Sequence, residues 1–67
     1  MSRIIVPEPV LEQLEQVRQD GGTNMVSRHG VQQVASELDL YELVLFCEDH
    51  RRDWAKVLRR FGEWLSD

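Results

Sequence analysis

The sequence lacks the covalent and metal bonds that hold many small domains together. Among its 67 residues there is a single cysteine, Cys47, which excludes an internal disulfide. The two histidines, His29 and His50, have no Cys, His or carboxylate at the spacing of a zinc site, so we predict no metal site. Stability must therefore come from apolar burial, and a chain of this length buries only about 60% of its unfolded surface.

Long apolar runs are also missing. The longest uninterrupted run, Leu43 to Cys47, is far shorter than the roughly 20 residues that cross a bilayer. At the start of the chain, Arg3 is followed by only three apolar residues before Pro7, which is unlike a secretory signal. We therefore expect a cytoplasmic protein that makes no contact with membranes and keeps its cysteine as a reduced thiol.

Positive charge is scarce and gathers near the end of the chain. Residues 1–50 hold nine Asp or Glu and three Arg, a net charge of −6, whereas residues 51–67 hold five Arg or Lys and three Asp or Glu, a net charge of +2. An acidic chain repels nucleic acid at long range. Any contact with phosphates would therefore have to use the C-terminal segment.

Proline and glycine are few enough to mark helix boundaries. Pro7 and Pro9 separate a short extended arm, residues 1–8, from a helix predicted over residues 9–20, which ends before Gly21. Its apolar residues follow the i, i+3, i+4, i+7 pattern. For the arm three alternatives stay open, because its β-branched residues can pack against the helices, be lent to a partner or fray.

A short turn precedes the second predicted helix. Thr23 or Asn24 is placed to cap this turn, and Met25 and Val26 are expected to point inward from it. The turn leads directly into the next apolar segment.

The second helix is predicted over residues 27–38, with Ser27 as its N-cap. Its apolar side consists of Val31, Val34, Ala35 and Leu38. After it the chain turns, and Asp39 is expected to cap the following helix, with Glu42 completing a capping box.

Residues 40–65 carry the strongest apolar pattern. At a seven-residue spacing they form three adjoining lines on a helix, and we call these lines together the apolar stripe. The lines are Leu40, Cys47, Trp54 and Phe61; Leu43, Val57 and Trp64; and Val44, Leu58 and Leu65. The pattern fails only at His50 and Arg51, which allows one long helix with a polar notch or two helices joined near Asp49 and His50. We favour a single helix, because the apolar phase is the same on both sides.

Together these elements predict one all-α domain over residues 1–67. It has three or four helices, with a helix-turn-helix-like hairpin followed by a long C-terminal helix. A continuous helix over residues 40–65 would be about 39 Å long, more than the rest of so short a chain can cover. Part of the apolar stripe is therefore expected to meet a second copy, as a homodimer, or another protein.

The aromatic residues of the stripe are the main candidates for that contact. The predicted interface consists of Trp54, Leu58, Phe61, Trp64 and Leu65. Within it Trp54 is expected to be buried, whereas Trp64 has little chain left to cover it and is expected at the contact. The predicted function is a small protein-interaction module.

Nucleic-acid binding is the alternative. A basic strip on one side of the last helix would hold a phosphate backbone without reading sequence, although such strips are more often solvated faces. The strip consists of Arg52, Lys56, Arg59 and Arg60. A DNA-reading helix-turn-helix over residues 31–49 is disfavoured, because the helix entering the groove would begin with Tyr41-Glu42-Leu43 and offer carboxylates instead of cations.

Enzymatic chemistry has one candidate pair. Cys47 and His50 are three residues apart, a spacing at which a histidine can activate a thiolate. A lone cysteine in an apolar stripe is usually an inert core residue, and the sequence offers neither a third residue to orient His50 nor a Gly-rich turn for an oxyanion. We therefore predict no catalytic residues, no cofactor site and no enzymatic activity.

One combination of motifs resembles a known family. The motifs are Thr23-Asn24-Met25, then Val31-Gln32 to Ala35, then Tyr41-Glu42-Leu43-Val44 with Phe46, Glu48, Asp49 and His50. They are similar, over about residues 10–61, to a family of short proteins encoded mainly by phages and prophages and described only as a domain of unknown function. This chain has Asp39 where that family has a glycine, and Val26 where it has an aromatic residue. The resemblance implies a phage or prophage setting, with a host or viral protein as partner, and brings no activity and no site residues.

Overall fold

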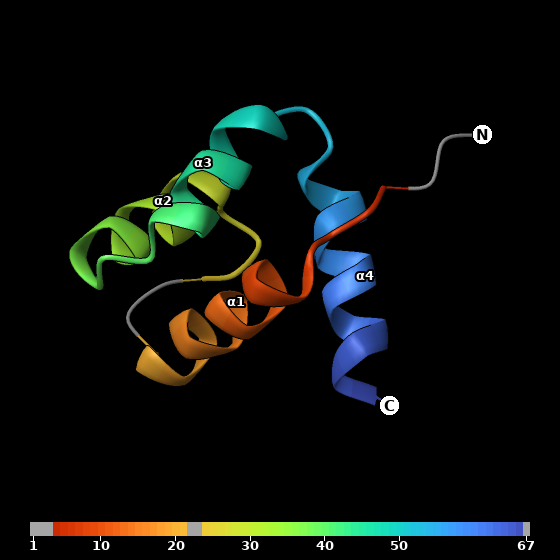
Figure 1. The fold of residues 1–67 in the computed structure, drawn as a ribbon. Coiled ribbons are helices and arrows are strands. Elements are labelled where there is room, and N and C mark those ends of the chain that lie inside the picture. The colour runs from red at the N-terminus through yellow and green to blue at the C-terminus, as the bar shows by residue number, and fades with distance from the viewer. Residues whose placement is uncertain (1–3, 22–23, 67) are drawn as a thin grey trace.

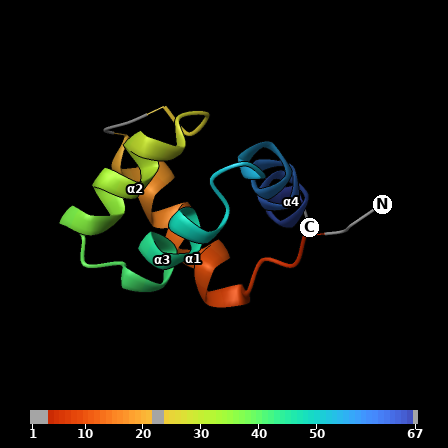
Figure 2. The ribbon, with the colours of Figure 1, turned by 90° about the horizontal axis from the view of Figure 1, so that it is seen from above.

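The computed structural model describes residues 4–21 and 24–66 and is all-α, as predicted. Its helices are α1 (Glu8–Asp20), α2 (Arg28–Glu37), α3 (Tyr41–Asp49) and α4 (Trp54–Ser66). Figures 1 and 2 show α2 and α3 side by side as a hairpin over α1, while α4 stands apart from that hairpin, beside the start of α1. None of these helices is long and apolar enough to span a membrane.

Helix α1 ends at Asp20, as the following glycine predicts, and begins at Glu8, one residue before the predicted start. The carbonyl oxygen of Pro7 accepts hydrogen bonds from the N–H groups of Val10 and Leu11, at 3.0 and 3.1 Å, and Pro9 occupies the first turn, where its missing N–H costs nothing. At the other end Gly21 adopts φ 71°, a left-handed conformation that favours glycine. The helix buries Val10, Leu11, Leu14 and Val17.

The connection into α2 is only partly as predicted. The Ser27 hydroxyl accepts a hydrogen bond from the Gly30 N–H at 3.2 Å, which confirms the N-cap, and the Asn24 side chain accepts one from the Val26 N–H at 3.0 Å. Thr23, the other predicted cap, lies outside the described residues. Met25 packs against the core, but Val26 is exposed. The inward orientation predicted for Val26 is wrong, because this residue occupies the outer corner of the turn that Asn24 and Ser27 close.

The single helix favoured over residues 40–65 is also wrong, because the chain forms α3 and α4 with a break at residues 50–53. The break falls where the apolar pattern fails, at the alternative joint near Asp49 and His50. The long axis of the molecule is 34 Å, shorter than the roughly 39 Å of one straight helix. Breaking the helix lets both halves of the apolar stripe pack against α1.

The capping box predicted for Asp39 and Glu42 gives way to a different turn. Asp39 has φ 60°, in the left-handed region, and the N-cap position of α3 belongs to Leu40. An N-cap residue takes an extended backbone, so a left-handed Asp39 reverses the chain between α2 and α3 instead of capping. Its carboxylate accepts a hydrogen bond from the Tyr41 hydroxyl at 3.0 Å.

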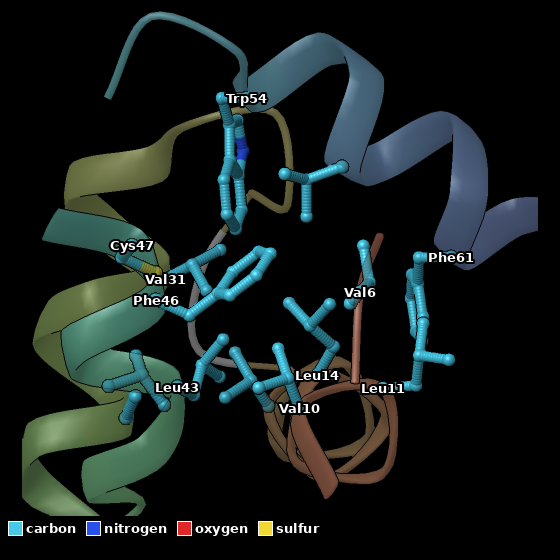
Figure 3. Close-up of a cluster of buried hydrophobic side chains, with 14 residues drawn as sticks. Val6, Val10, Leu11, Leu14, Val31, Leu43, Phe46, Cys47, Trp54 and Phe61 are labelled. Carbon is cyan, nitrogen blue, oxygen red and sulfur yellow. The ribbon is translucent and has the colours of Figure 1, made fainter. Parts of the chain in front are cut away.

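One apolar core joins all four helices and the arm (Figure 3). Val6 is buried, and Figure 3 shows it between the side chains of α1 and Phe61 of α4. Of the alternatives for the arm, packing against the helices therefore holds for Ile4 and Val6, whereas Ile5 is exposed and residues 1–3 lie outside the described part. The Trp54 indole N–H donates a hydrogen bond to the Met25 carbonyl oxygen at 3.0 Å. This bond fastens the start of α4 to the turn before α2.

Candidate interaction surface on the C-terminal helix

The structure divides the five predicted interface residues into two groups. Trp54 and Phe61 are buried in the core, whereas Leu58 and Trp64 are half-buried and Leu65 is 41% exposed. The surface part of the stripe is therefore smaller than the prediction, and we call these three residues (Leu58, Trp64 and Leu65) the α4 edge.

The α4 edge exists because α4 has few neighbours. Of the helices, α1 makes its main contact, and the centre of its apolar side, with Val57 and Phe61, faces α1 and the arm. The residues on the two flanks of that centre are only partly covered. Figure 1 shows the last turn of α4 running on past α1, which leaves the end of the helix without a layer over it.

Trp64 is held in place although part of it faces solvent. Its ring stacks on Phe61 with centroids 6.0 Å apart and an interplanar angle of 22°. Because Phe61 is itself buried, the core fixes the orientation of the tryptophan. A rigid and partly exposed aromatic ring loses little conformational entropy when a partner covers it, which is typical of the anchor residues of protein interfaces.

The four residues of the basic strip also reach the surface. Arg52 lies in the connection between α3 and α4, Lys56 and Arg59 are exposed on α4, and Arg60 is half-buried. No ion pair joins any of the four to another residue that the structure describes. Glu63, which follows Arg59 and Arg60 by one helical turn, adds a carboxylate to the same side of α4. The strip is therefore a mixed surface with a small positive excess.

Cys47 and His50 belong to the packing of α3. Cys47 is fully buried, and this burial raises the pKa of its thiol to about 11, although the nearby Arg28 acts in the opposite direction. His50 stacks on Phe46 with ring centroids 4.0 Å apart, and its Nδ1 lies 3.0 Å from the Phe46 carbonyl oxygen. The thiol is therefore protonated at neutral pH, and the imidazole of His50 packs at the C-terminal end of α3.

Groups of side chains that would hold a metal ion do not occur in residues 4–21 and 24–66, where no three His, Cys, Asp or Glu come together. A shallow groove between α2 and α3 is lined instead by a chain of internal hydrogen bonds. Arg28 donates to the Gln32 side-chain oxygen, and Gln32 donates to Glu48 at 3.0 Å. This hydrogen bond and the positive charge of Arg51 lower the pKa of Glu48. Arg28, Gln32, Glu48 and Arg51 are thus linked to one another along the groove.

Sequence reasoning missed one surface, the outward side of α3. Tyr41 and Leu45 are 65% and 66% exposed, and Leu38, in the turn before them, is exposed as well. The prediction that Leu38 belongs to the apolar side of the second helix is wrong, because α2 ends at Glu37 and Leu38 lies in the turn. We call these three residues the α3 face. The sequence contains a signal for this surface. Tyr41 and Leu45 are one helical turn apart, and none of the three residues lies on the lines of the apolar stripe.

Comparison with known proteins finds one family. Residues 6–58 match the family described as Domain of unknown function (DUF5049). The matched region runs from the buried part of the arm, through α1, α2 and α3, into α4. No curated protein and no solved structure matches the chain.

Proposed function

We propose, from the premise that this chain belongs to the DUF5049 family, a domain of unknown function, that it is a small non-enzymatic protein-interaction module. It self-associates, or docks on another protein, through the α4 edge. One observation carries the proposal: Leu58 and Trp64 are only half-buried and Leu65 is exposed, on a helix whose buried residues Trp54, Val57 and Phe61 fill the core. Because a second copy is present wherever the protein is, self-association is the form to test first.

The chemistry of the α4 edge supports a contact with protein. An aromatic ring held by a buried neighbour, with leucines on the opposite flank of the helix, offers apolar area that gains about 25 cal/mol for each Å² removed from water. A partly exposed tryptophan is also the residue type that most often dominates a protein interface. Nothing in this contact requires a reactive group, and the protonated, buried thiol of Cys47 agrees with a role in packing.

The cellular setting is part of the same proposal. The motifs Thr23-Asn24-Met25 and Tyr41-Glu42-Leu43-Val44 support a phage or prophage accessory protein. Such a protein works in the cytoplasm, and its partner other than itself is a host or viral protein.

Sedimentation equilibrium tests the proposal. We expect the wild-type protein at micromolar concentration to sediment above the 7.9 kDa of one chain, and Trp64→Ala to shift the mass toward 7.9 kDa. Val26→Ala is the matched control, because it shortens an exposed apolar residue outside the α4 edge. A wild-type mass of one chain, or equal masses for wild type and Trp64→Ala, would contradict self-association through this edge.

Nucleic-acid binding by the basic strip remains the second candidate, favoured by the exposed side chains of Lys56 and Arg59. Salt separates the two functions. An apolar contact persists or tightens at high ionic strength, whereas phosphate binding weakens steeply as counterions compete. If Arg59→Gln left both the affinity for a DNA duplex and its salt dependence unchanged, the basic strip would not be a nucleic-acid site.

A further inference from the structure

The α3 face is an unpartnered apolar surface. Tyr41 and Leu45 follow each other by one helical turn, on the side of α3 opposite the buried residues Leu43 and Cys47. Large apolar side chains that gather on one side of a helix and face water mark a site of contact. The Tyr41 ring is also restrained, because its hydroxyl donates to Asp39 at 3.0 Å.

Carboxylates surround this apolar face. Those on α3 and in the turn before it are Asp39, Glu42, Glu48 and Asp49. Between residues 29 and 50 the sequence has neither lysine nor arginine. Two cations act on Glu48: Arg51, whose largely exposed guanidinium lies 3.7 Å from its carboxylate, and Arg28, which is linked to it through Gln32. No ion pair joins Asp39, Glu42 or Asp49 to another residue that the structure describes. A partner that fits this surface must therefore combine an apolar anchor with positive charge.

Trp64 of the α4 edge belongs to a row of residues that has that combination. Lys56, Arg60 and Trp64 follow one another at intervals of four residues, so they form one row along α4, with two cations leading to a tryptophan. The charge of the chain is divided in the same way, at −6 for residues 1–50 and +2 for residues 51–67. The chain itself thus carries a surface with the apolar anchor and positive charge that the α3 face requires.

We propose that the α4 edge of one copy, with the row Lys56, Arg60 and Trp64, binds the α3 face of a second copy. This inference rests on the proposed function and names the partner of the same edge. Trp64 covers Tyr41 and Leu45, and the two cations lie over the surrounding carboxylates.

The two surfaces of one chain cannot meet each other. The α3 face points away from the core, and α4 packs against α1 on another side of the molecule (Figure 2). Each contact therefore joins different surfaces on the two copies. After one contact the first copy still has a free α3 face and the second a free α4 edge, so the pair either closes through a second, reciprocal contact into a symmetric dimer or adds further copies in a ring or an open chain.

A mixing experiment with two variants tests this geometry. Leu45→Arg puts a cation on the α3 face at a residue that is 66% exposed, and Trp64→Ala removes the anchor of the α4 edge. We expect each variant alone to lose self-association by about tenfold or more, as for other interface anchors. An equimolar mixture should recover a species of two chains, because the intact α4 edge of the first variant still fits the intact α3 face of the second.

Two further variants guard the interpretation. Val26→Arg makes the same change of charge at an exposed apolar residue outside both surfaces and should associate like the wild type. Lys56→Glu, at an exposed position, should weaken association without removing any apolar residue. Circular dichroism confirms that each variant is folded, and Lys56→Glu replaces Trp64→Ala in the mixture if the latter unfolds.

The outcomes separate this inference from the proposed function. If Leu45→Arg associates like the wild type while Trp64→Ala loses self-association, the α3 face is not the partner surface. Association through the α4 edge would then still stand. If Leu45→Arg and Trp64→Ala both fail to self-associate and their equimolar mixture keeps the mass of one chain, the head-to-tail contact would also be overturned. A wild-type protein that is one chain at micromolar concentration would overturn both.

Discussion

Asp39 illustrates how much a single backbone angle decides in this protein. It reverses the chain between α2 and α3 at φ 60°, a conformation that costs most residues roughly 1–2 kcal/mol and glycine almost nothing. A glycine at this position would adopt the angle without strain. Aspartate is among the few other residues that tolerate it, because its short side chain bonds locally, here to the Tyr41 hydroxyl.

Substitution of Asp39 tests this reading. We expect Asp39→Ala to lower the free energy of unfolding by about 1 kcal/mol, because alanine keeps the left-handed strain and loses the hydrogen bond. Asp39→Gly should recover most of that loss. Urea unfolding of the three proteins measures the difference, and an Asp39→Ala variant as stable as the wild type would contradict it.

Cys47 makes a pH-dependent contribution to stability. Burial raises the pKa of its thiol from 9.0 to about 11, so between these values the unfolded chain releases a proton that the folded chain keeps. The unfolded state then binds fewer protons, and stability falls as pH rises, with a slope approaching about 1.4 kcal/mol per pH unit. We expect the unfolding free energy of the wild type to fall more steeply from pH 9 to 11 than that of Cys47→Ala. Parallel curves would show that the thiol does not contribute.

At the scale of elements, the first two helices could be predicted and the break in the third could not. Proline, glycine and serine mark the ends of α1 and α2 by local geometry, so sequence alone places them. The apolar phase of residues 40–65 says which side of a helix is buried but not in which direction its axis runs. That direction depends on contacts distant in sequence, such as the bond from Trp54 to Met25. No glycine or proline marks residues 50–53, and the failure of the apolar pattern at His50 and Arg51 is compatible with one helix or two.

Helix α4 contains a glycine that it does not need. Gly62 is exposed in the helix, and a Cβ added there would meet nothing within 4 Å. We expect Gly62→Ala to raise the free energy of unfolding by about 0.5–1 kcal/mol, because alanine loses less backbone entropy on folding. Thermal unfolding measures the gain. An unchanged or lower melting temperature would contradict it.

The molecule as a whole consists of a three-helix unit with α4 attached at its side, and the arm is part of the attachment. Val6 lies between α1 and α4, whereas its neighbour Ile5 is 83% exposed. We expect Val6→Ala to cost about 1–2 kcal/mol, because it leaves a cavity between the two helices. Ile5→Ala should stay within about 0.5 kcal/mol of the wild type. Equal effects of the two substitutions in urea unfolding would refute this role of the arm.

The candidate site was also only partly predictable at this scale. Trp54 is buried, as the sequence predicts, and Trp64 is only half-buried, near the end of a helix that runs past α1. Phe61 was predicted at the interface with Trp64 but faces α1 and the arm, and only the tertiary arrangement removes it from the surface. The α3 face was not predicted, because its residues lie outside the seven-residue pattern of the apolar stripe.

The two tryptophans have separate environments, and this makes the protein its own optical probe. Trp54 is enclosed, with its indole nitrogen bonded to a carbonyl, while Trp64 keeps contact with water. A soluble quencher such as acrylamide therefore reaches the emission of one ring and spares the other. A molecule that binds over the end of α4 shields Trp64 from the quencher. Its binding can therefore be followed in unlabelled protein by fluorescence alone.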